Sequence, residues 1–170
     1  MKSKVLAFSL LALSTSFGVS AAEQGQGTVN FHGFVIDAPC SIDPENAEQT
    51  IEFGQVTKSF LAGGGKSEKP LNIKLINCDA TTASKGVQVT FGGGTVGATN
   101  TELLTAGSTN TAIMIRGYNQ DVVYGTPSTA VQVLNGSNTL TYTASLVQAT
   151  GTKVAEGEFT AVSNFTLAYP

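Results

Sequence analysis

The last twelve residues of the chain, 159–170, alternate large apolar with small or polar side chains. Phe165, Leu167 and Tyr169 fall on one face of an extended strand, and the residues between them fall on the other. Successive side chains of a strand point to opposite sides, so this pattern predicts a β-strand with one buried face. A single strand has nothing to pair with, so a chain that ends in this way must fold into a class that contains a sheet.

Shorter apolar segments recur along the chain and are separated by glycine-rich turns. Glycine triplets at 63–65 and 92–94 and the Asn135-Gly136 pair punctuate them, and no convincing amphipathic helix is present. This organisation is typical of an all-β sandwich. Besides the C-terminal segment, the predicted strands cover 34–37, 50–53, 71–77, 87–91, 112–116, 122–124, 130–134 and 140–148.

The first 22 residues have the composition of a secretory signal peptide. Two lysines precede a short apolar run at 5–13, and small residues follow, so cleavage is expected after Ala21 or Ala22. The apolar run is too short to span a bilayer, which argues against a membrane anchor. The remaining chain of about 148 residues has the size of one domain.

The charge of the mature chain excludes several partners. Without the two lysines of the leader, seven basic residues stand against twelve acidic ones, which gives a net charge of −5. A surface with this balance repels nucleic acid and anionic lipid. We therefore expect neither as a partner.

Two cysteines, Cys40 and Cys78, remain in the mature chain. An even number of cysteines in an exported protein indicates a disulfide. The alternative is a metal site built from both thiolates and the only histidine, His32. Structural zinc requires four such ligands, so we expect a disulfide and no metal.

The chain lacks the residues of a catalytic centre. Its single histidine, His32, lies on the polar face of an N-terminal alternating segment, where a solvated side chain is expected. The Gly65-Lys66-Ser67 sequence ends like a phosphate-binding loop, but Phe60 occupies the place of the required leading glycine. The acidic residues between 37 and 52 do not have the spacing of a calcium loop. The sequence therefore predicts no enzyme, no cofactor and no small-molecule substrate.

A second alternating segment lies near the start of the mature chain, at 25–33. One face carries Gly25, Gly27, Val29, Phe31 and Gly33. Nine extended residues reach about 30 Å, which is enough to run along a small sandwich. The segment is too polar and glycine-rich to form its own core. It is therefore either an ordinary first strand or a strand that pairs with another chain, and its residues alone leave both interpretations open.

The chain resembles the major pilins of chaperone–usher fimbriae, in particular the rod subunits of P pili and type 1 pili. The resemblance covers the whole mature chain. It starts with the alternating segment 25–33 and ends with Gly157, fourteenth from the C-terminus, and the penultimate Tyr169. Between them lie Asp-Ala-Pro-Cys-Ser-Ile at 37–42, Phe-Gly-Gln-Val at 53–56 and Asn-Cys-Asp at 77–79. One departure is the terminal Pro170, which has no N–H to donate.

The resemblance implies an immunoglobulin-like sandwich that is incomplete and is completed by a donor strand from another subunit. It divides the chain into a signal peptide at 1–22, a donor-strand extension at 23–33 and a pilin domain at 34–170. In this scheme Gly25, Gly27, Val29, Phe31 and Gly33 belong to the donor strand. The docking strand for a chaperone and then for the next subunit carries Gly157, Phe159, Phe165, Leu167 and Tyr169.

The same resemblance implies the partners and the location. They are identical subunits joined head to tail, a periplasmic chaperone and an outer-membrane usher, in a fimbria outside the cell that contributes to adhesion. The alternative is a minor or tip subunit, or a sugar-binding adhesin. Adhesins of this family carry an additional lectin domain, and this chain has room for one domain only. A secreted sandwich enzyme is disfavoured by the missing base.

Overall fold

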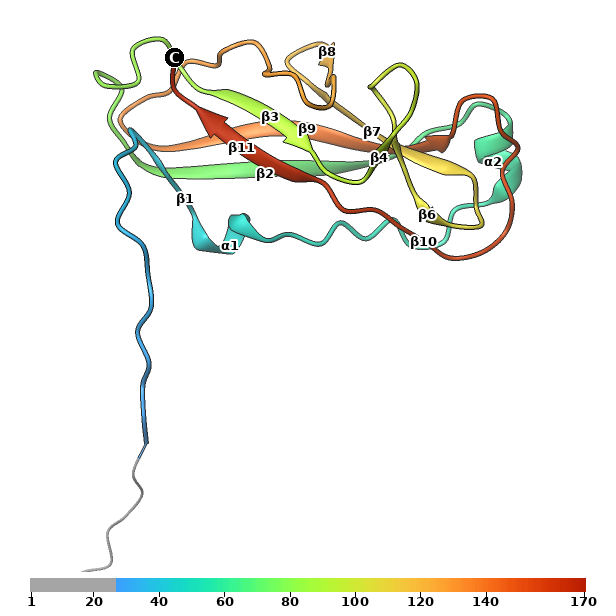
Figure 1. The fold of residues 1–170 in the computed structure, drawn as a ribbon, viewed down its shortest axis with the longest axis horizontal. Helices are drawn as coiled ribbons and strands as arrows, with labels where there is room; N and C mark the ends of the chain where they lie inside the picture. Colours follow the sequence, from blue (N-terminus) through green and yellow to red (C-terminus); the bar gives the residue numbers. More distant parts are fainter. Residues whose placement is uncertain (1–26) are drawn as a thin grey trace, which may run out of the picture. The chain divides into compact units, whose positions relative to one another are not determined.

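Two long antiparallel strands form the centre of the fold in the computed structural model, which describes residues 27–170 (Figure 1). They are β2 (Ser67–Cys78) and β9 (Gly136–Gln148), paired so that Ile73 lies opposite Leu140. Alternate residues of β2 from Leu71 to Leu75 are buried, as expected for a strand with one face on a core. The predicted signal peptide at 1–22 lies outside the described residues.

Shorter strands extend this pair into a seven-stranded sheet with the order β1-β2-β9-β7-β5-β4, and β8 pairs with β7 at the side. The additional strands are β1 (Ser41–Ile42), β4 (Thr95–Val96), β5 (Leu103–Leu104), β7 (Thr111–Gly117) and β8 (Gln120–Asp121). Neighbouring strands in this sheet are antiparallel.

A second layer covers the sheet and contains the C-terminal strand. There β11 (Asn164–Ala168) pairs with β3 (Gln88–Gly92), and β10 (Phe159–Thr160) pairs with β6 (Ala106–Gly107). The two layers meet in one apolar core, where Phe91 of β3 contacts Tyr142 of β9 edge to face, with ring centroids 5.1 Å apart. The predicted all-β sandwich is confirmed.

Two short helices lie in the chain between β1 and β2. The first, α1 (Pro44–Ala47), begins at Asp43, whose carboxylate accepts a hydrogen bond from the Glu45 N–H. Lys74 of β2 also binds this carboxylate, with Nζ and Oδ2 2.7 Å apart, and this contact lowers the pKa of Asp43. The second helix is α2 (Lys58–Ala62). Neither helix is long and apolar enough to cross a bilayer, and residues 27–170 contain no other.

Several predicted strands are absent or displaced. Residues 34–37 form no strand, and residues 50–53 run alongside the core without strand pairing. Residues 122–124 follow β8 as a loop, and in 130–134 only Val131 makes a bridge, to Val87. None of these segments pairs along its length with a neighbouring strand in the described residues, so an apolar sequence alone does not produce a strand.

The expected disulfide joins Cys40 and Cys78. Pairing of β1 with β2 places Ser41 opposite Ile76, which brings the adjacent Cys40 alongside the end of β2. The strand predicted at 34–37 would have placed Cys40 after the first strand of the domain, but residues 34–37 are not a strand and Cys40 precedes β1.

We expect Cys40→Ser to lower the free energy of unfolding by about 4 kcal/mol, because the disulfide closes a long loop in the unfolded chain. The sequence separation of the two cysteines is 38 residues. The amount of folded subunit should fall, and urea denaturation of the purified protein measures the loss. The double variant with Cys78→Ser should show the same loss as the single one. Two alkylated thiols in unreduced wild-type protein would contradict the expectation.

Candidate functional site

The C-terminal strand β11 is paired along one edge only. Its register with β3 runs from Asn164 opposite Gly92 to Ala168 opposite Gln88. Within residues 27–170 no second strand pairs with β11. An edge strand of this kind presents a row of N–H and C=O groups that another chain can bind. Figure 1 shows β11 side by side with β3.

The inward face of β11 is only half-buried, although it belongs to the core. Phe165, Leu167 and Tyr169 pack against the buried cluster but keep part of their surface accessible, while the residues between them are exposed. Phe165 lies against the fully buried Phe91, with ring centroids 6.4 Å apart. Interior strands of a sandwich normally bury such side chains completely. Their incomplete burial therefore indicates that the second layer lacks a strand beside β11.

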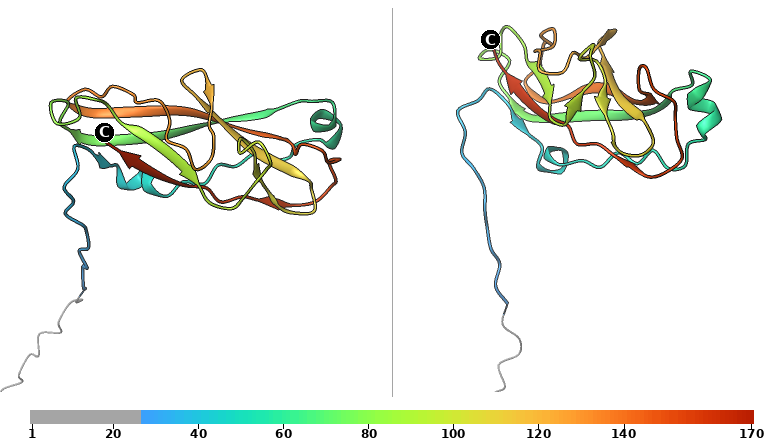
Figure 2. Two further views of the ribbon diagram at one scale, coloured as in Figure 1. Left: turned by 45° about the horizontal axis from the view of Figure 1, so that its top comes forward. Right: turned by 45° about the vertical axis from the view of Figure 1, so that its right-hand side comes forward.

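Residues 50–56, between α1 and α2, form a second border of this incompletely covered part of the core. Ile51, Phe53 and Val56 are half-buried against the same core, and no backbone–backbone hydrogen bond is found within this stretch. Phe53 contacts Phe159 at the start of the C-terminal segment, with ring centroids 6.1 Å apart. Figures 1 and 2 show this stretch along the same side of the domain as β10 and β11.

The phenol of Tyr169 is a buried polar group without a hydrogen-bond partner in the described part of the chain. Burial raises the pKa of Tyr169, so its hydroxyl stays protonated at neutral pH and is available as a donor. A buried hydroxyl without a partner is unfavourable by about 1–3 kcal/mol. The end of β11 therefore carries an unsatisfied donor next to an unpaired strand edge.

Gly157 precedes the C-terminal segment at a point where a side chain does not fit. Its φ angle is +148°, and a Cβ atom there would lie 2.8 Å from Oγ of Ser108. This close approach allows β10 to pair with β6 two residues later. The predicted terminal strand is split into β10 and β11, with residues 161–163 between them.

The predicted donor residues are described from Gly27 onward, and Gly25 lies outside the described residues. Residues 27–37 contain no strand or helix. Val29 and Phe31 are 73% and 92% exposed, and Phe34 and Val35 are exposed as well. The chain separates into two units, Met1–Val35 and Ile36–Pro170. Large apolar side chains in such a state require another surface to cover them.

Among residues 27–170, no group of three or more histidine, cysteine, aspartate or glutamate side chains is placed to hold a metal. The row on β11 was predicted from the sequence. The opposite border at 51–56 was not predicted as part of a site, although the alternation of Ile51 and Phe53 was a signal that could have found it.

Comparison with known proteins gives a single family. A family model described as fimbrial protein matches residues 26–170. The Pap fimbrial major pilin protein of Escherichia coli is 44% identical over 185 residues, which cover 99% of this chain and all of the relative. The Fimbria A protein of Serratia marcescens is also 44% identical, over 98% of this chain and 97% of its own length.

Solved structures agree with this result. A chain from a chaperone–usher pilus, solved in a study of rod uncoiling, superposes with a TM-score of 0.82 at 43% identity. It covers 89% of this chain and 100% of its own length. The crystal structure of the P pilus rod subunit PapA superposes with a TM-score of 0.72 at 41% identity, over 78% of this chain and 100% of that chain.

Proposed function

The chain belongs to the fimbrial protein family and is a structural subunit of an extracellular bacterial fimbria, and from this premise we propose how it assembles. The extension at 25–33 acts as a donor strand that pairs with the free edge of β11 in the next subunit. Addition of a strand to an exposed sheet edge is an established mode of recognition, for which chaperone–pilin complexes are a known case. The observation that carries the proposal is the unpaired edge of β11.

The lengths of the two partners support this proposal. The edge from β10 to β11 covers residues 159–168, which span about 33 Å when extended. The nine residues of the donor span about 30 Å. The donor strand can form hydrogen bonds along both of its edges. One edge would face β11, and the other would face residues 50–56, whose N–H and C=O groups make no backbone–backbone hydrogen bond in the described residues. A strand between these borders would complete the layer.

The side chains of the donor support the same arrangement. Val29 and Phe31 would each contribute about 1.5–3 kcal/mol when buried against the half-buried row on β11. Gly27 and Gly33 on the same face leave room for close approach of the two backbones. Hydrogen bonds along β11 add to this, and the phenol of Tyr169 would gain a neighbour.

The proposed assembly partners follow from the exposed edge of β11. An unpaired apolar edge is prone to aggregation before assembly, so a periplasmic chaperone that lends a strand would protect the subunit. The donor and the acceptor are different surfaces of the same chain. Such a heterologous contact gives open filaments instead of closed rings. An outer-membrane usher would then receive subunits from the chaperone and pass them to the growing fibre.

Substitution of Phe31 by Asp tests the proposal at a single side chain. The matched control is Asn30→Asp, which adds the same charge on the opposite face of the extension. We expect Phe31→Asp to reduce filaments per cell at least tenfold, because the contact loses its largest apolar group and gains a charge. Asn30→Asp should assemble normally. Electron microscopy of expressing cells counts the filaments, and equal counts for the two variants would refute the proposal.

A further inference from the structure

One charged residue is buried in residues 27–170, and it is Glu102, which is 8% exposed. Within this part of the chain its carboxylate accepts hydrogen bonds only from Thr150, from the N–H at 3.0 Å and from the hydroxyl at 2.6 Å. None of the ion pairs in residues 27–170 includes it. Buried charges are normally paired with an opposite charge, because an unpaired one is unfavourable away from water. The charge of Glu102 therefore lacks a cation in the single subunit.

Glu102 borders an open pocket of about 380 Å³, which we call the Glu102 pocket. Leu61 of α2, Met114 of β7 and Val147 of β9 line its wall, and Lys66 is its one basic residue. Each carboxylate oxygen can accept two hydrogen bonds, so the two bonds just described leave a free position on both oxygens. An apolar wall beside a carboxylate suits a long aliphatic side chain that ends in a positive charge, as lysine does.

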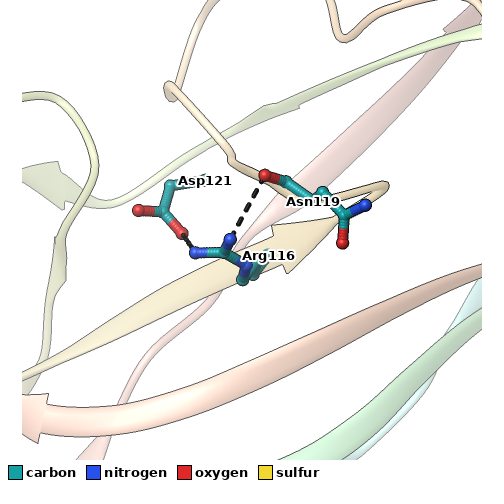
Figure 3. A network of polar contacts seen from close by, with 3 residues as sticks. All are labelled: Arg116, Asn119 and Asp121. Carbon is teal, nitrogen blue, oxygen red and sulfur yellow. Dashed lines mark hydrogen bonds and ion pairs between the residues drawn. The ribbon is translucent and has the colours of Figure 1, made fainter.

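Four of the seven basic residues of the mature chain make no ion pair within residues 27–170. Arg116 is not one of them, because its guanidinium donates to Asp121 at 3.1 Å and to the backbone oxygen of Asn119 at 3.2 Å (Figure 3). Lys58 and Lys74 are paired with carboxylates as well. The candidates for the missing cation are therefore Lys66, Lys69, Lys85 and Lys153.

Lys85 is the one of these four that lies at the opposite end of the domain from the Glu102 pocket. Lys66 and Lys69 lie at the start of β2, and Lys153 lies two residues past the pocket lining. Lys85 lies beyond the other end of β2, whose 12 residues span about 40 Å. It is exposed, so its ammonium group is accessible to another subunit.

The proposed donor strand brings these two ends together. Strand β11 runs toward the Lys85 end, because its last residue, Ala168, lies opposite Gln88. A donor strand antiparallel to β11, like the strand pairs of the described sheets, would run the other way and end on the side of α2. The domain that follows this donor begins near Cys40, which is bonded to Cys78 at the end of β2. The pocket end of one subunit would therefore meet the Lys85 end of the next.

We propose that the Lys85 side chain of one subunit enters the Glu102 pocket of its neighbour in the fibre and forms an ion pair with the Glu102 carboxylate. This inference rests on the proposed head-to-tail assembly and adds a contact outside the donor strand. The ammonium group would meet a carboxylate that is largely shielded from solvent, where electrostatic attraction is stronger than at an exposed surface. The aliphatic part of the lysine would pack on the pocket wall.

Zero-length crosslinking of purified filaments with a carbodiimide tests the contact, because this reagent joins a carboxylate to an amine that touches it. The filaments are assembled from a mixture of isotopically labelled and unlabelled full mature chains. We expect a crosslinked peptide pair that contains Glu102 and Lys85 and combines the two labels, which shows that the residues come from different subunits. Normal filaments without this pair, or with Glu102 joined to Lys66 instead, would overturn the inference and leave the donor-strand proposal intact. Failure of the wild-type chain to form filaments would count against the donor strand itself.

Lys85→Gln should lower the temperature at which filaments fall apart, because it removes one partner of the ion pair, and Glu102→Gln should lower it by a similar amount. The double variant should lose no more than either single one, because both side chains act through the same contact. The matched control is Lys153→Gln, which removes the same charge from another lysine without a partner in residues 27–170. Its filaments should behave like wild type when light scattering is followed during heating. Equal dissociation temperatures for Lys85→Gln and Lys153→Gln would refute the assignment.

Urea denaturation of the unassembled mature chain separates this role of Glu102 from a structural one. Glu102→Gln should leave the free energy of unfolding of the single subunit unchanged or raise it, because it removes a buried charge that has no cation and keeps the shape of the side chain. The loss should therefore be confined to the filament. If Glu102→Gln weakens the single subunit as well, Glu102 serves the fold and the proposed contact is wrong.

Discussion

Deletion of residues 25–31 should leave a subunit that folds with its chaperone and forms no fibres. The deleted residues carry Val29 and Phe31, which are exposed in the single chain and belong to no strand. The buried core is drawn from residues 40–154, and the C-terminal strand remains intact. The expected product is a chaperone-bound monomer, visible as one species by size-exclusion chromatography, with no filaments by electron microscopy.

A peptide of residues 25–33 provides a second measurement on the same variant. It should bind the deleted subunit and displace the chaperone, since it restores the missing donor, and a peptide of scrambled order should not. Two outcomes would contradict the donor-strand interpretation. Misfolding of the deleted subunit would indicate an internal first strand, and fibres of normal length would show that another contact drives assembly.

The sequence predicted those strands in which an apolar alternation is hydrogen-bonded to a neighbouring strand over most of its length. Residues 71–77 lie within β2 and residues 140–148 lie within β9, because each strand pairs with the other over most of its length. The C-terminal segment was predicted for the same reason, since β11 pairs with β3. Only the break at 161–163 was missed, which lies where the segment passes from pairing with β6 to pairing with β3.

The sequence failed where an apolar segment has no partner strand within residues 27–170. Residues 34–37 and 50–53 have the composition of strands, yet neither forms one. Strand propensity reflects packing and pairing with neighbours, so an alternation alone cannot tell whether the neighbour belongs to the same molecule. Under the proposed function the neighbour of residues 50–56 is another subunit. The incorrectly predicted strand is thus a border of the proposed docking site.

Substitution of Tyr169 by Ser should abolish stable binding of the chaperone. Tyr169 ends the half-buried row on β11, and its ring packs against the core from a strand whose outer edge is open. Loss of this aromatic contact removes about 2 kcal/mol, which corresponds to a roughly thirtyfold weaker complex. The unprotected subunit would then be degraded. Co-purification with the tagged chaperone, followed by an immunoblot of the periplasm, measures both effects.

Ala168→Ser is the matched control for this variant, because it introduces the same residue one position away on the exposed face of β11. It should keep wild-type chaperone binding and fibre formation. Leu167→Ser, on the inward face, should resemble Tyr169→Ser. If Tyr169→Ser co-purifies with the chaperone as well as Ala168→Ser does, the inward row of β11 is not the docking surface. A loss shared by both inward variants and absent from the outward one is the result expected if the bound strand covers that face.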